Sequence, residues 1–176
     1  MVIWLIGLSK SGKTTLTRLL YDRLKPMIPN LVRLDGDLIR ELFGHDVDHT
    51  VGGRRKNAER LSHLSKFLSD QNIHVIAAVL SIFPEWRRWN RANIPGYAEV
   101  YLKTSLETVK RRDSDNLYIH ALQGKIKNVV GVDIPFPEPE GSDLIIDNDA
   151  QRDDFEELIS QIVSLPVIQK MIEGNR

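Results

Sequence analysis

The sequence contains no cysteine. Disulfide bonds, thiolate nucleophiles and cysteine-ligated metal sites are therefore excluded, and the composition suits a reducing compartment. A long apolar run is also missing at the N-terminus, where the run covers only residues 2–8 and follows no basic residue. Such a run is too short for a membrane span and lacks the charged start of a signal peptide. We therefore expect a cytoplasmic protein without a membrane partner.

Net charge is absent as well, since 24 lysines and arginines balance 24 aspartates and glutamates among 176 residues. The basic residues form no long run, so we expect no nucleic-acid partner and only a local anion site. A chain of this length is long enough for one α/β domain with its own core and too short for two. The sequence therefore predicts a single domain over residues 1–176.

A glycine-rich motif, residues 7–14, overlaps the end of the N-terminal apolar run at residues 2–8. Residues 2–6 predict a buried strand, and leucines at helical spacing predict a helix over residues 14–26. A glycine-rich turn between a strand and a helix lets backbone N–H groups converge on a phosphate. A chance match would also have to explain this flanking strand and helix. In this pattern Lys13 reaches the outer phosphates of a nucleotide and Thr14 holds Mg²⁺. The predicted nucleotide-binding residues are Gly7, Leu8, Ser9, Lys10, Ser11, Gly12, Lys13, Thr14 and Thr15.

The second predicted strand covers residues 31–34, and the sequence Asp35-Gly36-Asp37 follows it directly. This places two carboxylates at the carboxyl end of the strand. Ligands of open α/β sheets lie at the carboxyl ends of the strands, so we expect Asp35 and Asp37 beside the phosphate loop. From their order in the chain, Asp35 is predicted to support Mg²⁺ and Asp37 to orient or deprotonate an acceptor hydroxyl. The predicted catalytic residues are Lys13, Asp35 and Asp37.

The rest of the chain alternates strands with helices. Further strands are predicted at residues 73–80, 97–102 and 144–146, and further helices at about residues 38–43, 54–70, 84–91, 105–112 and 153–165. Five strands alternating with helices predict a parallel sheet flanked by helices, which with the phosphate loop makes a P-loop nucleoside-triphosphate-binding fold. Residues 44–53 are predicted to form a loop over the substrate, and the polar stretch 113–128 a mobile lid that excludes water.

Three further residues have both a structural and a functional interpretation. His74 lies within a predicted strand, where a lone histidine is more often a satisfied structural residue than a ligand. Trp86 and Trp89 are three residues apart in a predicted helix, which favours packing on the sheet over stacking on a nucleobase.

The combination of a phosphate cradle, a Mg²⁺ ligand, an acidic pair and nearby arginines predicts phosphoryl transfer. This chemistry needs positioning and charge neutralisation more than covalent steps. A GTPase would read guanine with an Asn-Lys-x-Asp sequence, which does not occur in the chain. The sequence therefore favours a kinase.

Beyond the phosphate loop, the chain carries a set of spaced motifs. They are Leu34-Asp35-Gly36-Asp37 with Arg40; Arg54 and Asn57 with Arg60; Thr104-Ser105-Leu106-Glu107; Arg112-Asp113; Leu117-Tyr118; Gly124 with Ile126-Lys127; and Gly131-Val132-Asp133-x-Pro135. Together they resemble the adenylylsulfate kinases, which transfer the γ-phosphoryl group of ATP to the 3′-hydroxyl of adenylyl sulfate. The resemblance covers residues 3–147 and implies ATP and Mg²⁺ as cofactors and a nucleotide as substrate. Members of that family are often dimeric, so a homodimer is also an expectation.

The resemblance further implies a role for each matching residue. Arg112 is expected at the ATP. The residues expected at the acceptor are Asp37, Arg40, His49, Arg54, Asn57, Ile82, Lys127 and Val129.

The chain also departs from that family. Lys10 replaces a loop glycine, at a position that the general phosphate-loop pattern leaves free. Phe83 replaces a serine able to carry a transient phosphate, which excludes a phosphoserine route there. His49 and Val129 stand where the family has two phenylalanines that enclose the adenine, and Asp115 replaces a lysine in the lid. These departures concern mainly the identity of the acceptor.

Three hypotheses follow. The first is a kinase that acts on adenylyl sulfate. The second is a kinase for a cytidine nucleotide such as cytidine diphosphoramidate, used in surface-polysaccharide modification. The third is a non-catalytic nucleotide-binding module, against which the intact Lys13, Asp35 and Asp37 argue.

Overall fold

The computed structural model describes residues 1–152 and 154–174. Its centre is a five-stranded parallel sheet with the strand order β2-β3-β1-β4-β5. The strands are β1 (Val2–Ile6), β2 (Leu31–Asp35), β3 (His74–Val79), β4 (Tyr97–Lys103) and β5 (Leu144–Asp147). The five predicted strands and their parallel arrangement are confirmed.

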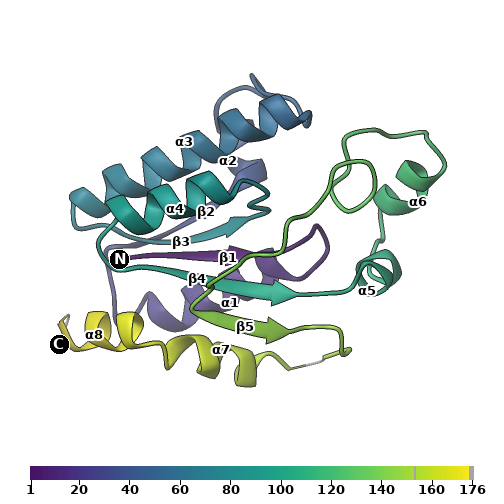
Figure 1. The fold of residues 1–176 in the computed structure, drawn as a ribbon. Helices are drawn as coiled ribbons and strands as arrows, with labels where there is room; N and C mark the ends of the chain where they lie inside the picture. Colours follow the sequence, from purple (N-terminus) through teal and green to yellow (C-terminus); the bar gives the residue numbers. More distant parts are fainter. Residues whose placement is uncertain (153, 175–176) are drawn as a thin grey trace.

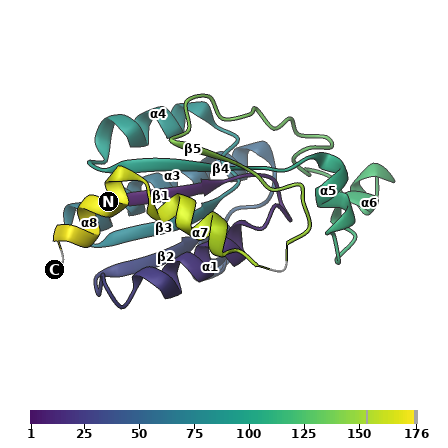
Figure 2. The ribbon, with the colours of Figure 1, turned by 90° about the horizontal axis from the view of Figure 1, so that it is seen from below.

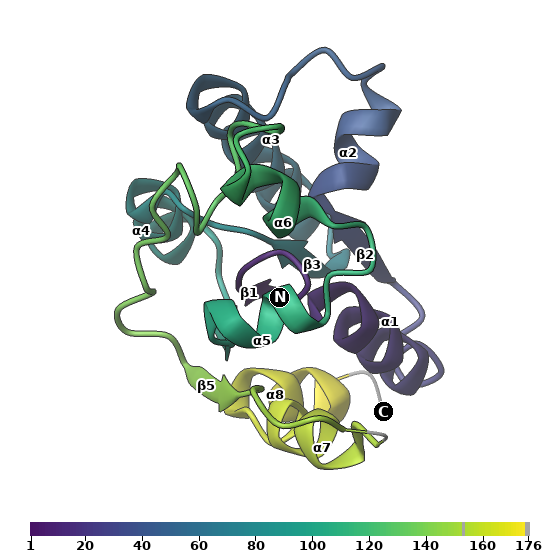
Figure 3. The ribbon, with the colours of Figure 1, turned by 90° about the vertical axis from the view of Figure 1, so that its right-hand side faces the viewer.

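Helices cover both faces of the sheet (Figures 1 and 2). One face carries α1 (Lys13–Leu24), α7 (Glu156–Val163) and α8 (Pro166–Gly174). The other carries α2 (Gly36–Leu42), α3 (Val51–Asp70) and α4 (Pro84–Asn93). Two short helices, α5 (Leu106–Arg111) and α6 (Leu117–Leu122), lie beyond the carboxyl ends of the strands (Figure 3).

Strand β1 is the centre of the core because both of its faces are covered. Ile3 and Leu5 pack into the cluster below the sheet with α1, α7 and α8. Trp4 and Ile6 point to the opposite face, as the period of two in a strand requires, and join the cluster under α3. All four side chains are completely buried. The phosphate loop therefore begins at the end of a fully buried strand.

Most helix boundaries differ from the prediction by one to three residues; α1, for example, is Lys13–Leu24 rather than residues 14–26. Helix α3 begins at Val51 rather than at residue 54, because the Thr50 hydroxyl accepts a hydrogen bond from Gly53 N and caps the helix there. The predicted loop therefore ends at residue 50. Residue 153, the predicted start of the closing helix, lies outside the described residues, and α7 runs from Glu156. Helix α8 was not predicted, since Pro166 reads as a stop signal although proline also suits a first helical turn.

The predicted lid contains helix α6 and is attached to the phosphate loop. Tyr118 is completely buried, and its hydroxyl donates to the Ser9 carbonyl oxygen at 3.0 Å. Lys10 forms an ion pair with Asp115. The two residues that depart from the family pattern in the loop and in the lid therefore contact each other.

The residue ranges 1–152 and 154–174 contain no helix that is long and apolar enough to cross a membrane.

The structural interpretation of His74 is confirmed, whereas the two tryptophans pack on helix α3 rather than on the sheet, where they were predicted to pack. His74 Nδ1 lies 3.0 Å from the N-terminal nitrogen of Met1, at the amino ends of the strands. The rings of Trp86 and Trp89 lie 5.9 Å apart and both meet His63 of α3 edge-on. These contacts join α4 to α3.

Candidate active site

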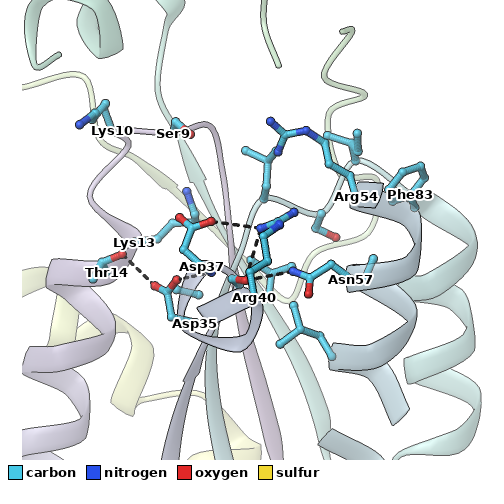
Figure 4. Close-up of a pocket in the computed structure, with 18 residues that line it drawn as sticks. Ser9, Lys10, Lys13, Thr14, Asp35, Asp37, Arg40, Arg54, Asn57 and Phe83 are labelled. Carbon is cyan, nitrogen blue, oxygen red and sulfur yellow. Dashed lines mark hydrogen bonds and ion pairs between the residues drawn. The ribbon is translucent and has the colours of Figure 1, made fainter. Parts of the chain in front are cut away.

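Two hollows meet at the phosphate loop. The first has a volume of about 270 Å³ and lies between the loop, α2, α3 and the residues after β3 (Figure 4). The second has a volume of about 430 Å³ and lies between the loop, Arg112 and the residues after β5. Lys10, Lys13 and Thr14 line both hollows. A group held at Lys13 is therefore accessible from two sides.

Two glycines shape the loop. Gly12 has a φ of 95°, a conformation that side chains other than glycine rarely adopt, and it caps the N-terminus of α1. A Cβ on Gly7 would come within 2.7 Å of Ser11 Oγ and 2.8 Å of the Leu102 carbonyl oxygen. Asn148, which follows β5, donates from Nδ2 to the Ser11 carbonyl oxygen at 2.9 Å. The loop is therefore shaped by its glycines and held by the segment that follows β5.

Lys13 is the charged group at the junction of the two hollows. Its Nζ donates to the Leu8 carbonyl oxygen at 2.6 Å. Burial lowers the pKa of Lys13 to about 8, while the nearby Asp35 and Asp37 act in the opposite direction. The free site thus lacks enough negative charge to keep this lysine fully protonated, which suits a ligand that brings its own negative charge.

A polyphosphate bound at Lys13 is expected to raise the lysine pKa and draw in a proton. Because the free pKa is about 8, calorimetric titration with the ATP analogue AMPPNP and Mg²⁺ should show uptake of about half a proton at pH 8 and almost none at pH 6.5. The uptake is measured from the dependence of the heat on buffer ionisation enthalpy. Lys13→Arg keeps the positive charge at every pH in this range and should bind without uptake. Equal heats in all buffers at pH 8 would refute the coupling.

The acidic pair lies at the end of β2, as predicted. Asp35 Oδ2 accepts a hydrogen bond from the Thr14 hydroxyl at 3.0 Å, and Asp35 Oδ1 accepts one from Asp37 N at 2.9 Å. Asp35 therefore caps the N-terminus of α2 with one carboxylate oxygen and contacts Thr14 with the other. Asp37 forms an ion pair with Arg40 at 3.1 Å (Figure 4).

Thr14 and Asp35 provide a donor set that fits Mg²⁺. Both present oxygen atoms, and Mg²⁺ at nucleotide sites usually takes only one or two protein ligands, with phosphates and water supplying the others. Within the described parts of the chain, no three histidine, cysteine or carboxylate side chains gather into a metal site. A metal ion here would therefore depend on the nucleotide for most of its ligands.

Four predicted acceptor residues line the first hollow with Asp37. Arg40 and Asn57 are buried, Arg54 is half-buried, and Ile82 is buried in the wall after β3. Burial lowers the pKa of Arg54, and the charge of Arg40 lowers it further, which indicates that the two guanidinium groups lie close enough to repel each other. Two neighbouring cations, one buried and one half-buried, favour an anionic ligand between them.

Three predicted acceptor residues do not line the first hollow. His49 is exposed at its rim, where burial and the charges of Arg40 and Arg54 lower the histidine pKa, and its carbonyl oxygen accepts from Arg54 Nε at 2.8 Å. Lys127 is exposed on the lid. Val129 is 4% exposed and packs into the apolar cluster beneath the lid, because the Asp133 carboxylate binds its backbone N–H at 2.6 Å.

The second hollow contains the predicted Arg112 and residues that the sequence motifs do not mark. Arg112 donates to the Ala150 carbonyl oxygen at 2.8 Å, which places it beside the segment after β5. Thr15, a predicted nucleotide-binding residue, lines this hollow. The unmarked lining residues are Asn148, Gln151, Arg152 and Phe155. They become neighbours of the phosphate loop only when β5 joins the sheet, so local sequence could not reveal them.

A phosphate loop, an acidic pair and a lid at the carboxyl ends of a parallel sheet define a P-loop kinase. The comparisons agree: residues 1–147 match the adenylylsulphate kinase family model. The chain belongs to this family of phosphotransferases. It is 41% identical over 162 residues to a cytidine diphosphoramidate kinase of Campylobacter jejuni, covering 92% of this chain and 94% of that protein. It is 34% identical to an adenylyl-sulfate kinase of Paraburkholderia xenovorans, covering 93% of each chain.

A solved structure gives the same fold. The APS kinase CysC of Mycobacterium tuberculosis, in complex with AMPPNP and APS, superimposes with a TM-score of 0.81 at 30% identity. The match covers 93% of this chain and 95% of that chain. That relative therefore holds an ATP analogue and a nucleotide acceptor on the fold found here.

Proposed function

We propose that this protein is a Mg²⁺-dependent kinase that transfers the γ-phosphoryl group of ATP to the 3′-hydroxyl of a nucleotide with an activated 5′ group. The observation that carries the proposal is the meeting of two hollows at Lys13 and Thr14. In phosphoryl transfer the attacking and leaving oxygens lie roughly in line on opposite sides of the phosphorus. ATP in the second hollow and the acceptor in the first would meet this requirement.

The residues at the junction then have distinct tasks. Lys13 neutralises charge on the transferred group, and Asp37 accepts the proton of the acceptor hydroxyl or orients it. Mg²⁺ held through Thr14 and Asp35 would neutralise further charge on the outer phosphates. Arg40 and Arg54 hold the anionic 5′ group of the acceptor, which relieves the repulsion between their guanidinium groups.

For the acceptor we place cytidine diphosphoramidate ahead of adenylyl sulfate. The Campylobacter relative named for the first substrate is 41% identical to this chain. In addition, neither position of the adenine-enclosing phenylalanine pair offers an aromatic wall in the hollow, since His49 is at the rim and Val129 is buried below the lid. Stacking on an aromatic side chain contributes about 1–3 kcal/mol per base, so adenine loses more here than a smaller base. The 34% identical adenylyl-sulfate kinase supports the second candidate.

Turnover with the two acceptors tests the proposal. Purified protein is supplied with Mg·ATP and either cytidine diphosphoramidate or adenylyl sulfate, and ADP formation is followed together with the 3′-phosphorylated product by mass spectrometry. We expect a higher kcat/KM with the cytidine nucleotide. A preference for adenylyl sulfate would exchange the two candidates, and turnover of neither acceptor would reject the proposed reaction.

Restoring one aromatic ring is expected to help adenine selectively. His49→Phe should raise kcat/KM for adenylyl sulfate by about tenfold, corresponding to one stacked base, and change the value for the cytidine nucleotide less. His49 is exposed, so the larger ring requires no repacking of the core. Val129 is an unsuitable site for the same change, because a phenylalanine there would overpack a buried cluster. Equal gains for both acceptors would show that base stacking is not what distinguishes them.

A further inference from the structure

Lys10 joins the phosphate loop to the lid. Its ammonium group donates a hydrogen bond to Asp115 Oδ2 and forms an ion pair with that carboxylate. Asp115 is held in turn by Ser114, whose hydroxyl donates to Asp115 Oδ1 at 2.8 Å. The hydrogen bond from Lys10 lowers the pKa of the Asp115 carboxyl. The start of the lid is therefore tied to the loop by a pair of opposite charges.

The backbone of Lys10 has a conformation that lysine rarely adopts. Its φ is 62°, in the left-handed region that favours glycine. Backbone strain of this kind persists only where surrounding contacts hold the residue, and it concentrates at functional sites. Glycine, the family's residue at this position, would avoid the strain. The lysine adds an ammonium group to the loop in spite of it.

Lys10 also borders the place where the phosphates of a nucleotide are expected. It lines both hollows together with Lys13 and Thr14, and Figure 4 shows it beside Ser9, across the hollow from Arg54. Its partner Asp115 lies outside both hollows. A lysine ammonium group carries three N–H donors on a flexible side chain. Lys10 therefore has two alternative anionic partners, the carboxylate of the lid and a bound phosphate.

A bound polyphosphate is the stronger of these two partners. The side chain of Asp115 is 72% exposed, and an exposed ion pair contributes little because water and salt screen it. A nucleotide polyphosphate carries more negative charge than one carboxylate, even when Mg²⁺ neutralises part of it. It also displaces water from the hollow, where the attraction between charges becomes stronger. Its charge repels Asp115 as well, so both effects favour transfer of Lys10 to the nucleotide.

A second contact keeps most of the lid in place when this ion pair opens. The Tyr118 hydroxyl donates to the Ser9 carbonyl oxygen, and the Tyr118 N–H donates to Asp113 Oδ2 at 2.7 Å. Tyr118 is completely buried, so a phosphate cannot reach these hydrogen bonds. Loss of the ion pair therefore frees only the residues around Asp115, before α6 begins.

We propose that Asp115 is an internal substitute for a nucleotide phosphate: it pairs with Lys10 in the free protein, and a bound polyphosphate displaces it and frees the start of the lid. The contact is autoinhibitory, because the nucleotide has to break it in order to gain Lys10. Both residues depart from the family pattern, so the exchange belongs to this chain. The inference rests on the proposed function only for the binding of ATP at the loop.

Dissociation constants for AMPPNP with Mg²⁺, measured by calorimetry, test the exchange. Asp115→Asn keeps the shape of the side chain but removes the competing charge, so it should bind AMPPNP about two- to fivefold more tightly, the range for an exposed ion pair. Lys10→Met removes the ammonium group and should bind about three- to tenfold more weakly. In the double variant, Asp115→Asn should bring no gain, because no ammonium group remains to be released.

Glu107→Gln is the matched control. Glu107 is an exposed carboxylate on α5, outside both hollows, and its loss should leave the dissociation constant at the wild-type value. Lys10→Gly removes the ammonium group together with the backbone strain, and it should weaken binding as Lys10→Met does even if the methionine variant folds poorly.

Hydrogen exchange of the backbone amides of residues 114–116 tests the release of the lid. In the wild type, AMPPNP should speed exchange there, whereas in Asp115→Asn exchange should already be fast without the nucleotide. The amide of Tyr118, which is bound by Asp113, should stay protected in both proteins. Slower exchange at residues 114–116 on binding of AMPPNP to the wild type would overturn the inference.

Equal or weaker binding of AMPPNP by Asp115→Asn would also overturn it. So would an equal gain from Asp115→Asn in the Lys10→Met background, because that gain would come from repulsion alone and not from exchange of a partner. Failure of the proposed function has a different signature. In that case Asp115→Asn still binds AMPPNP more tightly than the wild type, but neither acceptor is phosphorylated with ATP.

Discussion

Replacing Lys13 by alanine is expected to lower kcat at saturating ATP by at least about a hundredfold. The ammonium group lies at the junction of the two hollows, where negative charge on the transferred phosphoryl group has to be neutralised. A lost charge-assisted contact in a closed site corresponds to about 3 kcal/mol or more of transition-state stabilisation. The measurement is steady-state ADP formation with the preferred acceptor over a range of ATP concentrations.

Lys170→Ala provides the control for this variant. Lys170 lies exposed on α8, far from the carboxyl ends of the strands, and its loss should leave kcat unchanged (Figure 1). Circular dichroism of both variants checks that the fold is intact. A Lys13→Ala enzyme with nearly normal kcat would contradict the assignment of the ATP site.

Replacing Asp37 by asparagine is expected to lower kcat by about a hundredfold to ten-thousandfold at saturating Mg²⁺, the usual contribution of a positioned general base. Asparagine has the same shape but cannot take the proton of the acceptor hydroxyl. Asp37 lines the first hollow and pairs with Arg40, whereas the carboxylate that accepts from Thr14 is that of Asp35. The variant should therefore need no more Mg²⁺ for half-maximal activity than the wild type.

Asp35→Asn is the matched variant for this experiment, and it should show the opposite pattern. Asparagine remains a good helix N-cap, so α2 is retained, but the charge beside Thr14 is lost. We expect a higher Mg²⁺ concentration for half-maximal activity and recovery of much of kcat when Mg²⁺ saturates. If Asp37→Asn changes only the Mg²⁺ requirement, the roles of the two aspartates must be exchanged.

The residues that the sequence predicted at the site belong to local motifs, whereas those it missed contact the site from distant parts of the chain. Lys13 and Thr14 could be predicted from the loop motif after β1, and Asp35 and Asp37 from their place at the end of β2, because the ends of parallel strands meet at one edge. Asn148 is 137 residues from Ser11, the residue it holds, so only the pairing of β4 with β5 brings them together. The same pairing brings Arg152 and Phe155 to the second hollow.

One difference comes from a contact that no sequence pattern signals, and one backbone conformation at the site is equally unmarked in the sequence. Val129 was expected at the acceptor, but the Asp133 carboxylate holds the backbone N–H groups of Asn128 and Val129 and turns this segment so that the valine side chain packs under the lid. Ser81, which lines the first hollow with a φ of 57°, carries no mark in the sequence, because a positive φ is expected at glycine and not at serine.

The sequence by itself determined the chemistry of this protein. The spacing of motifs and the pattern of apolar residues can be read from short stretches of sequence. They were sufficient to predict the parallel sheet, the phosphate loop and the acidic pair. The tertiary structure decided which residues line each of the two hollows beside Lys13 and which predicted residues stay outside them. It also decided which buried side-chain oxygens in the walls have no hydrogen-bond partner among the described residues. These features depend on how side chains from distant segments pack, and packing follows from the whole fold rather than from any one segment.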